Sequence, residues 1–398
     1  MATQTMLDRR HLLRAAGSVA GLGAFGLGGC VSLRNTSVGP AGNSIPHLAP
    51  VRAEKDRLFD ITVCLRPFRA AGPRLDTEQV GRKLVVHNYG HGGSGWSLSW
   101  GSASIALRKA MTVSPRRIAI IGCGAIGTTT ALLAREAGVD VTIYARDLLP
   151  DTRSARATGS WTPDSRIALT SAAAPGFGDL WEEMARISFK RYRRYLGLPG
   201  SPVEWTDRYF LSDFTPEQAA AHQPPDPLGF ASYHERIRDL TPAAQNVRPE
   251  NTPFPVASVR RTTQMMFNVA DYGHTLLNDY LEAGGRIERR EFHALGDVAQ
   301  LSEDVVINCT GYAARELCKD ETVVPVRGQI GWLIPQPEVN YGVIYDGISM
   351  LSRRDGIVIQ SLEGGDMRGY NDANETADRA ESEHSVAKIA DLYARMRY

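Results

Sequence analysis

The middle of the chain shows short apolar runs separated by glycine turns and amphipathic stretches, a pattern that predicts alternating strands and helices. The run IAII at 118–121 is apolar at every position, as in a parallel strand buried on both faces. A glycine-rich turn follows, and the next stretch has helical spacing as far as Gly138. The run VTIY at 141–144 predicts a second strand, which completes a strand–turn–helix–strand unit.

The second half of the chain continues with both kinds of element. DYGHTLLNDYLEAGG at 271–285 predicts a helix with a double-glycine stop, and EDVVINCTG at 303–311 predicts a buried strand. Antiparallel strands are expected in VVPVRGQIGWLIP, YGVIYDGISML and DGIVIQS, with RRDG as a turn between the last two. A final helix is expected in ESEHSVAKIADLYARM at 381–396. The pattern predicts an α/β protein without an internal repeat.

The N-terminal stretch MLDRRHLLRAAGSVAGLGAFGLGGC has the order of an export signal. A twin-arginine pair, Arg9 and Arg10, precedes an apolar stretch of about fifteen residues, which is too short to span a bilayer. The alternative is a cationic N-terminal helix. LGGC resembles a lipobox in which Cys30 is acylated, with simple cleavage as the alternative. We therefore expect a signal at 1–30, a polar tether at 31–58, and an exported, periplasmic or cell-envelope protein that a lipid can anchor.

Bulk composition narrows the class of protein. The 398 residues are enough for two or three domains, and a net charge of +1 gives no indication of a nucleic-acid partner. After Cys30, the four remaining cysteines are spaced unlike any metal motif, so no metal site is expected and buried free thiols are favoured.

The turn GCGAIG has the spacing of a dinucleotide-binding loop. Gly122 permits the tight turn, Gly124 lets a pyrophosphate approach the backbone, and Gly127 allows close packing of helix against strand. The positive end of the helix then faces the phosphates. Asp147 is placed to bind a ribose, whereas Arg146 before it fits either a 2′-phosphate or the adenine pocket. This motif alone leaves NAD(P) and FAD open.

A second glycine-rich stretch, VVHNYGHGGSGWSLSWGSA, precedes the first one by about fourteen residues. Its backbone is free of side chains over GHGG and suits close approach to a flat ligand. A helix is expected to start near Ser97 or Ser102. We interpret His87 and His91 as structural hydrogen-bonding residues, and the tryptophans at 96 and 100 as packing residues.

This stretch resembles the signature of the D-amino-acid oxidase family, which includes D-aspartate oxidases. CLRPFRAAGPRL, IYARDLLPDTRSARATGSW, VVINCTG and RGQI resemble further segments of that family, so the resemblance covers nearly everything after residue 58. It implies FAD as the cofactor. It also implies a Rossmann-like FAD-binding domain at 83–165 and 255–315, and an α+β substrate domain with an antiparallel sheet at 59–82, 166–254 and 316–398.

The order of these segments differs from that of the family. There the arginine loop and the HNYGHGG stretch lie near the C-terminus, whereas here both precede the dinucleotide loop and no second copy follows. We interpret this order as a circular permutation, joined through SASIALRKAMTVSP. The C-terminal helix is then expected beside residues 52–63, and the two glycine loops on opposite sides of one cofactor.

The resemblance assigns roles to individual residues. Arg66 matches the arginine that binds the substrate carboxylate, with Arg69 as its rival; Tyr345 matches a tyrosine on the same carboxylate; the Gly93 carbonyl matches the acceptor for the amine. Ser349 stands where the family carries a second tyrosine, so the pocket is expected to be wider or more polar. Cofactor contacts are implied for Gly92, Gly93, Ser94, Gly95, Trp96, Ser97, Gly122, Cys123, Gly124, Ala125, Ile126, Gly127, Arg146, Asp147, Thr152, Ser154, Thr158, Gly159, Ser160 and Phe292.

The implied reaction is oxidative deamination of a D-amino acid to a 2-oxo acid and ammonia. The flavin takes a hydride from Cα of the neutral amine without a dedicated base, and oxygen reoxidises it to give hydrogen peroxide. One alternative is a flavin dehydrogenase that passes electrons to a membrane quinone. Another is an inactive FAD-binding protein of the cell envelope.

Overall fold

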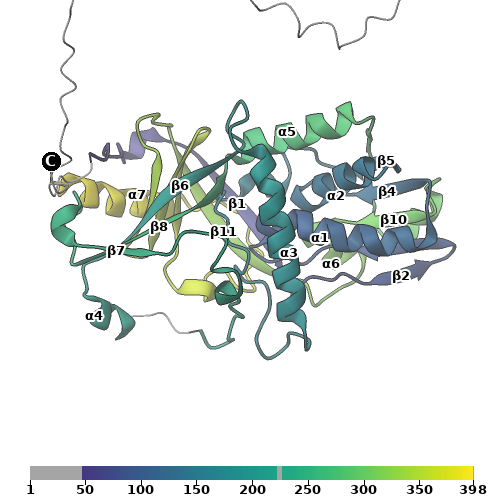
Figure 1. Ribbon diagram of the computed structural model, residues 1–398, viewed down its shortest axis with the longest axis horizontal. Helices are drawn as coiled ribbons and strands as arrows, with labels where there is room; N and C mark the ends of the chain where they lie inside the picture. The colour runs from purple at the N-terminus through teal and green to yellow at the C-terminus, as the bar shows by residue number, and fades with distance from the viewer. Residues whose placement is uncertain (1–46, 222–225, 398) are drawn as a thin grey trace, which may run out of the picture. The chain divides into compact units, whose positions relative to one another are not determined.

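Two β-sheets carry the fold in the computed structural model, which describes residues 47–221 and 226–397 (Figure 1). The expected export signal and residues 31–46 of the expected tether lie outside these residues. The remainder of that expected tether is not a free linker, because Val51, Ala53 and Leu58 are buried in an apolar cluster. Within the described residues, no helix is both long and apolar enough to cross a bilayer. The α/β class predicted from the sequence is confirmed.

The six-stranded sheet contains the expected strand–turn–helix–strand unit. Its order is β2-β3-β10-β4-β5-β9, parallel except for the edge strand β2. Ile118 and Ile120 belong to one apolar cluster, whereas Ala119 and Ile121 belong to another, so this strand is buried on both faces as predicted. The strands are β2 (Thr77–Val80), β3 (Lys83–His87), β4 (Arg117–Ile121), β5 (Asp140–Ala145), β9 (Arg286–Arg289) and β10 (Val305–Asn308).

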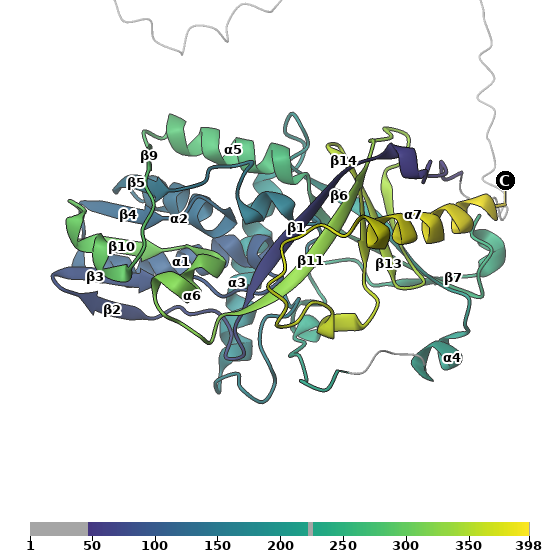
Figure 2. The same cartoon turned by 180° about the vertical axis from the view of Figure 1, so that it is seen from behind.

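The eight-stranded sheet has the order β1-β11-β14-β13-β12-β6-β8-β7 and is antiparallel except for the β12–β6 pair. β1 and β11 pair along almost their whole length (Figure 2). Its strands are β1 (Leu58–Phe68), β6 (Val203–Ser212), β7 (Gln245–Val247), β8 (Ser258–Phe267), β11 (Val324–Leu333), β12 (Tyr341–Tyr345), β13 (Ile348–Arg353) and β14 (Gly356–Ser361).

Helices cover both sheets. α1, α2, α3 and α5 pack into the apolar cluster of the six-stranded sheet, and α7 covers one face of the eight-stranded sheet. α7 and α5 match the expected helices, and α1 begins at Gly95, before the expected Ser97 or Ser102. The helices are α1 (Gly95–Ala110), α2 (Ala125–Glu136), α3 (Phe177–Tyr192), α4 (Pro216–Ala221), α5 (Val269–Glu282), α6 (Ala314–Leu317) and α7 (Arg379–Ala394).

The expected domain boundaries imply a different sheet for two of the strands. β2 falls in the range 59–82, expected in the substrate domain, but it pairs with β3 as a hairpin in the six-stranded sheet. β8 falls in the range 255–315, expected in the FAD-binding domain, but it pairs with β6 along ten residues. Strand pairing over long sequence separations decides the sheet here, and residue order alone does not reveal it.

The C-terminal helix lies against the start of β1. Glu383 of α7 forms an ion pair with Lys55 at 3.5 Å, and the side chains of Leu58 and Ser382 both pack over Gly331 of β11. The last residue, Tyr398, lies outside the described residues.

Candidate functional site

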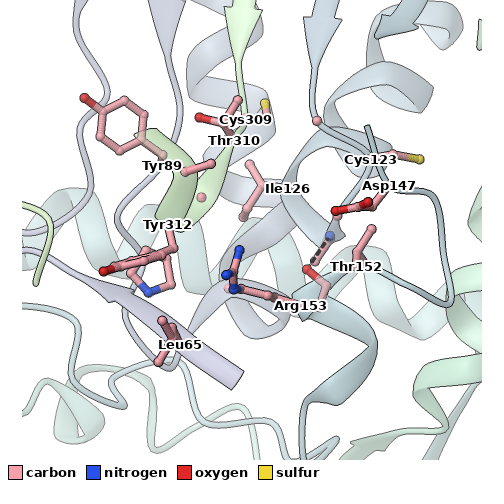
Figure 3. Close-up of a pocket in the computed structure, with 18 of the residues that line it drawn as sticks. Leu65, Tyr89, Cys123, Ile126, Asp147, Thr152, Arg153, Cys309, Thr310 and Tyr312 are labelled. Atoms are coloured by element: carbon pink, nitrogen blue, oxygen red, sulfur yellow. Dashed lines mark hydrogen bonds between the residues drawn. The ribbon is translucent and has the colours of Figure 1, made fainter. Parts of the chain in front are cut away.

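A cavity of about 500 Å³ lies at the carboxyl ends of β4, β5 and β10, where α/β sheets bind their ligands (Figure 3). Residues 64–67 of β1 bring the other sheet to the same cavity. Both glycine-rich stretches line it. It contains these predicted residues: Arg66, Gly92, Gly93, Gly95, Trp96, Gly122, Cys123, Gly124, Ala125, Ile126, Arg146, Asp147, Thr152, Ser154, Thr158 and Phe292.

The dinucleotide loop is shaped by close backbone contacts. Gly122 has a φ of +102°, and a Cβ there would lie 2.6 Å from the carbonyl oxygen of Cys309. A Cβ on Gly127 would lie 2.0 Å from the Gly122 carbonyl, so its predicted role in helix–strand packing matches its position, although it does not line the cavity. The Ala125 N–H, at the start of α2, donates to Ser154 Oγ at 3.0 Å.

The loop that follows β5 holds polar atoms without partners. Thr152 Oγ1 and Arg153 Nε are both buried, and neither has a hydrogen-bond partner in the described residues. The Arg153 guanidinium also pairs with Glu375 at 2.5 Å and lies 5.5 Å from the ring centre of Tyr312. This part of the cavity therefore offers unused donors beside the N-terminus of α2.

The far end of the cavity is lined by an ion-pair group and an aromatic ring. Arg146 pairs with Asp147 at 2.8 Å and with Glu291 at 3.2 Å. The hydrogen bond from Arg146 lowers the pKa of Asp147. Because two carboxylates already neutralise Arg146, its geometry favours lining the pocket over binding a 2′-phosphate. Phe292 supplies a flat apolar surface.

The glycines of the GHGGSG loop at 90–95 allow close packing within the protein. Gly92 has a φ of +55°, and a Cβ there would lie 1.9 Å from the Arg166 carbonyl oxygen. The Gly93 N–H donates to the Ser165 carbonyl at 2.9 Å. Both glycines line the cavity, but they are required because residues 165–166 press against the loop from the other side.

Besides Gly127, four predicted cofactor residues lie outside the cavity lining. Ser94 Oγ donates to the Ser165 carbonyl, and Ser97 Oγ accepts from the Thr162 N–H at 2.8 Å, so both serines fix the segment at 162–165. Gly159 packs against the Phe267 carbonyl, and Ser160 Oγ accepts from Arg208 at 3.0 Å. The hydroxyls of these three serines thus form hydrogen bonds within the protein.

Of the two rival arginines, Arg66 is the one that lines the cavity. Its guanidinium lies over Gly328, where a Cβ would be 2.4 Å from Nη1 and Nη2, and it donates to the Arg327 carbonyl at 3.4 Å. It has no ion-pair partner among the described residues, and burial lowers its pKa. Arg69 instead pairs with Asp320 at 3.3 Å and lies outside the cavity lining. The geometry therefore favours Arg66 over its rival.

The predicted roles of Tyr345 and Ser349 do not fit their positions. β12 and β13 are joined by a two-residue turn, which pairs Tyr345 with Ile348 and Ile344 with Ser349. Tyr345 therefore points to the α7 side, where its hydroxyl donates to Asp213 at 2.6 Å and accepts from Arg395. Ser349 is on the opposite face and accepts from Arg208 at 2.9 Å. Neither residue lines the cavity.

The two histidines hold the loop, as expected from the sequence. His87 Nε2 lies 3.0 Å from Glu78, and His91 Nε2 lies 2.7 Å from Ser102 Oγ. Burial lowers the pKa of His91 to about 3, so its ring stays neutral at physiological pH. Among the cysteines, Cys123 and Cys309 are buried free thiols, whereas Cys64 and Cys318 are half-buried and free.

The buried ring of His91 predicts acid sensitivity. In the unfolded chain a histidine has a pKa of about 6.5, so below that pH the unfolded chain binds a proton that the folded chain rejects. As the pH is lowered from 6.5 to about 3, this group should decrease the free energy of unfolding by at most about 1.4 kcal/mol per pH unit. Urea unfolding should show that the free energy of unfolding decreases less between pH 7 and pH 5 in His91→Gln than in the wild type. Equal decreases in the two proteins would contradict this prediction.

Comparison with known proteins identifies the family. The sequence profile of the family described as FAD dependent oxidoreductase matches residues 117–397. The chain belongs to the FAD dependent oxidoreductase family. FAD is accordingly its cofactor, and the expectation from the stretch VVHNYGHGGSGWSLSWGSA is confirmed.

The similar proteins include amino-acid oxidases. A D-amino-acid oxidase of Dictyostelium discoideum is 28% identical over 213 residues, which cover 53% of this chain and 55% of that protein. One from Rubrobacter xylanophilus is 28% identical over 214 residues, 54% of this chain and 58% of that protein. The chain thus matches little more than half the length of these relatives. Glycine oxidase from Geobacillus kaustophilus has a TM-score of 0.46 and 12% identity, covering 71% of this chain and 80% of that one.

The cavity fits the cofactor of the FAD dependent oxidoreductases. The two glycine loops leave backbone where a dinucleotide needs close approach, and α2 directs its N-terminus at the same space. The unpaired Thr152 Oγ1 and Arg153 Nε would find acceptors on a diphosphate. Phe292 and the Arg146–Asp147 pair would hold the adenosine end.

Sequence reasoning missed several polar residues at this site. Arg153 lies between two predicted positions, Thr152 and Ser154, and that location was a usable signal. Tyr312 directly follows the VVINCTG segment, whereas Glu375 reaches the cavity from a segment that carries no motif. Arg208, which holds Ser160 and Ser349, lies on a strand whose alternation does not mark it.

Proposed function

We propose that this oxidoreductase uses FAD to oxidise a D-amino acid to an imino acid, which water hydrolyses to a 2-oxo acid and ammonia, with oxygen as the electron acceptor and hydrogen peroxide as product. The observation that carries the proposal is the placement of Arg66, a guanidinium without an ion-pair partner among the described residues, on the cavity that both glycine loops line. The similarity to D-amino-acid oxidases supports it.

The residues of the chain act mainly by binding and orientation. Arg66 would pair with the substrate carboxylate through two parallel hydrogen bonds, which fix its plane as well as neutralise it. The backbone at Gly93 would accept from the amine. Bound FAD supplies the hydride acceptor. Because His91 is neutral and tied to Ser102, it is not placed to act as a base, and the amine must bind in its neutral form.

The decisive experiment mixes the holoprotein anaerobically with a panel of D-amino acids and their L-enantiomers while flavin absorbance is followed. Bleaching by D-amino acids alone supports the proposal. Bleaching by L-amino acids alone, or by no amino acid, would contradict it. Peroxide yield compared with reduction of an artificial quinone separates an oxidase from a dehydrogenase.

We further propose that the chain is a circular permutant within its family. The family profile begins at Arg117. β1 and β3 precede it, and they belong to the eight-stranded and the six-stranded sheet, respectively. The GHGGSG loop and α1 also precede it. The C-terminal α7 lies against the start of β1, and Ala49 and Met396 belong to the same apolar cluster. These contacts support a short closure between the ends of the folded part.

A relinked variant tests the permutation. It joins residues 115–397 through a short glycine–serine linker to residues 47–114, which restores the order typical of the family. Because all core contacts are kept, we expect wild-type FAD content and an unfolding temperature within about 2 °C, equivalent to a change of roughly 1–2 kcal/mol in the free energy of unfolding. As a control, the same linker is inserted between Ser114 and Pro115 of the native chain. This control shows whether interrupting the chain at that point changes FAD content or the unfolding temperature. Failure of the relinked chain alone to bind FAD would contradict the proposal.

We propose export through the twin-arginine signal, with acylation at Cys30 as the anchor; the support is the order of charge, apolar run and small residues in the sequence. Cell fractionation of the wild type and of Arg9→Lys/Arg10→Lys is the test. Equal distribution of both between cytoplasm and envelope would contradict it.

A further inference from the structure

Arg166 has a largely buried side chain beside the GHGGSG loop, and the proposed reaction does not use it. Its φ of +48° lies in the left-handed region, and its carbonyl oxygen presses on Gly92, which lines the cavity. Only 11% of its side chain is exposed. A left-handed backbone is strained in a residue that carries a side chain, so the surrounding structure holds Arg166 in this position.

The Arg166 side chain binds one turn of the chain, residues 364–369. Its Nε donates to the Asp366 carbonyl at 2.8 Å, and its Nη2 donates to the Gly365 carbonyl at 3.1 Å. Nη2 also pairs with Asp366 Oδ1 at 3.5 Å, although 54% of the Asp366 side chain is exposed. The glycines at 364, 365 and 369 all have a positive φ. Arg166 therefore supplies the contacts that fix the Asp366 carboxylate on a glycine-rich turn.

The same turn lies against Arg66. Arg66 Nη1 donates to the Arg327 carbonyl at 3.4 Å, and a Cβ on Gly369 would lie 2.1 Å from that same oxygen. The Arg327 N–H in turn donates to the Gly369 carbonyl at 2.8 Å. Burial lowers the pKa of Arg66, and the nearby Asp366 carboxylate opposes this decrease. Asp366 is thus close enough to act on Arg66, yet its ion pair is with Arg166.

Two guanidinium groups therefore share one carboxylate. Burial, followed by the charge of Arg66, lowers the pKa of Arg166 to about 10. A carboxylate within reach of two cations pairs with the one that its geometry brings closer. If Asp366 paired with Arg66, it would occupy the donors that a substrate carboxylate needs. Because Arg66 is buried, water and salt would screen that competing pair less than a surface pair.

We propose that Arg166 is a positioning residue that keeps Asp366 away from Arg66, and thereby leaves the Arg66 guanidinium open to the carboxylate of the substrate. The inference rests on the proposed function and deepens it, because Arg66 is the residue that binds the substrate there. Arg166 lies outside the cavity lining and acts through Asp366.

A binding titration tests this role without turnover. The oxidised holoprotein is titrated with butyrate, a carboxylate without an amine, and flavin absorbance reports binding. Arg166→Met should weaken butyrate at least about fivefold, because the released Asp366 then pairs with Arg66. Arg166→Met/Asp366→Asn should bind butyrate as tightly as the wild type, since the competing charge is gone. A double variant as weak as the single one would mean that Arg166 is merely structural, and would overturn the proposal.

The matched control is Arg368→Met, on the same turn. Arg368 pairs with Glu381 at 2.9 Å, so its loss disturbs the turn without releasing Asp366 from Arg166. Butyrate binding should stay within about twofold of the wild type, and a loss as large as that of Arg166→Met would overturn the proposal. Should Arg166→Met fail to fold, Asp366→Asn at the half-exposed side chain decides. It should tighten butyrate at least about twofold, and unchanged binding would contradict the role of Asp366.

Turnover separates this inference from the proposed function. With a D-amino acid as substrate, Arg166→Met should raise KM and leave kcat nearly unchanged, because Asp366 competes with substrate binding and not with hydride transfer. If D-amino acids reduce the flavin and Arg166→Met leaves KM unchanged, the positioning role is wrong and the function stands. If no D-amino acid reduces the flavin but the single variant weakens butyrate and the double variant restores it, the function is wrong and the positioning role stands.

Discussion

Arg66→Ala is expected to lower kcat/KM for the D-amino acid about a hundredfold, while FAD stays bound. The guanidinium lines the cavity and has no ion-pair partner among the described residues, so the substrate carboxylate would be its main counter-charge. Loss of such a desolvated bidentate pair costs about 3 kcal/mol, because the carboxylate is left buried and unpaired. Steady-state kinetics and the flavin-to-protein absorbance ratio measure the two effects separately.

The control for this prediction is Arg69, three residues further on. Arg69→Ala should lower the unfolding temperature, because it breaks the pairing with Asp320, but it should leave KM close to that of the wild type. Arg66→Lys should fall between wild type and Arg66→Ala, since it keeps the charge and loses the planar fork. A large loss of efficiency in Arg69→Ala with none in Arg66→Ala would reverse the assignment.

Local rules explain what could be predicted of the fold. The run at 118–121 is apolar throughout, and the strand there is buried on both faces. The glycine spacing at 122, 124 and 127 required a turn between strand and helix, and the structure has one. Such features depend on neighbouring residues, so the sequence expresses them directly. The long signature also placed both glycine loops at one cavity, although they belong to different connections of the sheet.

Positions that depend on register could not be read from spacing. Tyr345 and Ser349 are four residues apart, and a continuous strand would place both on one face. The turn at Asp346 and Gly347 changes the alternation, so Tyr345 faces α7 and Ser349 faces away from it. Similarly, β8 was assigned to the wrong part of the fold because its pairing with β6 spans about sixty residues of sequence.

Polar groups that act through long-range contacts left no signal. Arg208 becomes notable only when the sheet brings Ser349 to it and the segment after Gly159 brings Ser160. Nothing within its own strand distinguishes it from a surface arginine. The same holds for Glu375, which meets Arg153 across more than two hundred residues. The electrostatics of the site are therefore a property of the tertiary structure.

Gly122→Ala is expected to yield a folded chain that has lost its FAD. Gly122 has a φ of +102°, which an alanine adopts only with strain, and the new Cβ would lie 2.6 Å from the Cys309 carbonyl oxygen. The loop must shift, and with it the N-terminus of α2 and the Ser154 contact at Ala125. Strain of about 1–3 kcal/mol at this position, borne by the holo conformation, should weaken FAD binding by roughly 5- to 150-fold.

The measurement is the FAD content of the purified protein, together with reconstitution by added FAD followed by fluorescence quenching. Gly296→Ala is the matched control, because a Cβ there meets no atom within 4 Å and the residue lies outside the cavity lining. It should keep wild-type FAD content. Far-ultraviolet circular dichroism shows whether Gly122→Ala retains its secondary structure. If the turn at 122 holds the diphosphate, relieving the clash must move its backbone N–H groups away from the phosphate oxygens and so release FAD. Full FAD content in Gly122→Ala would therefore mean that this turn does not hold the diphosphate.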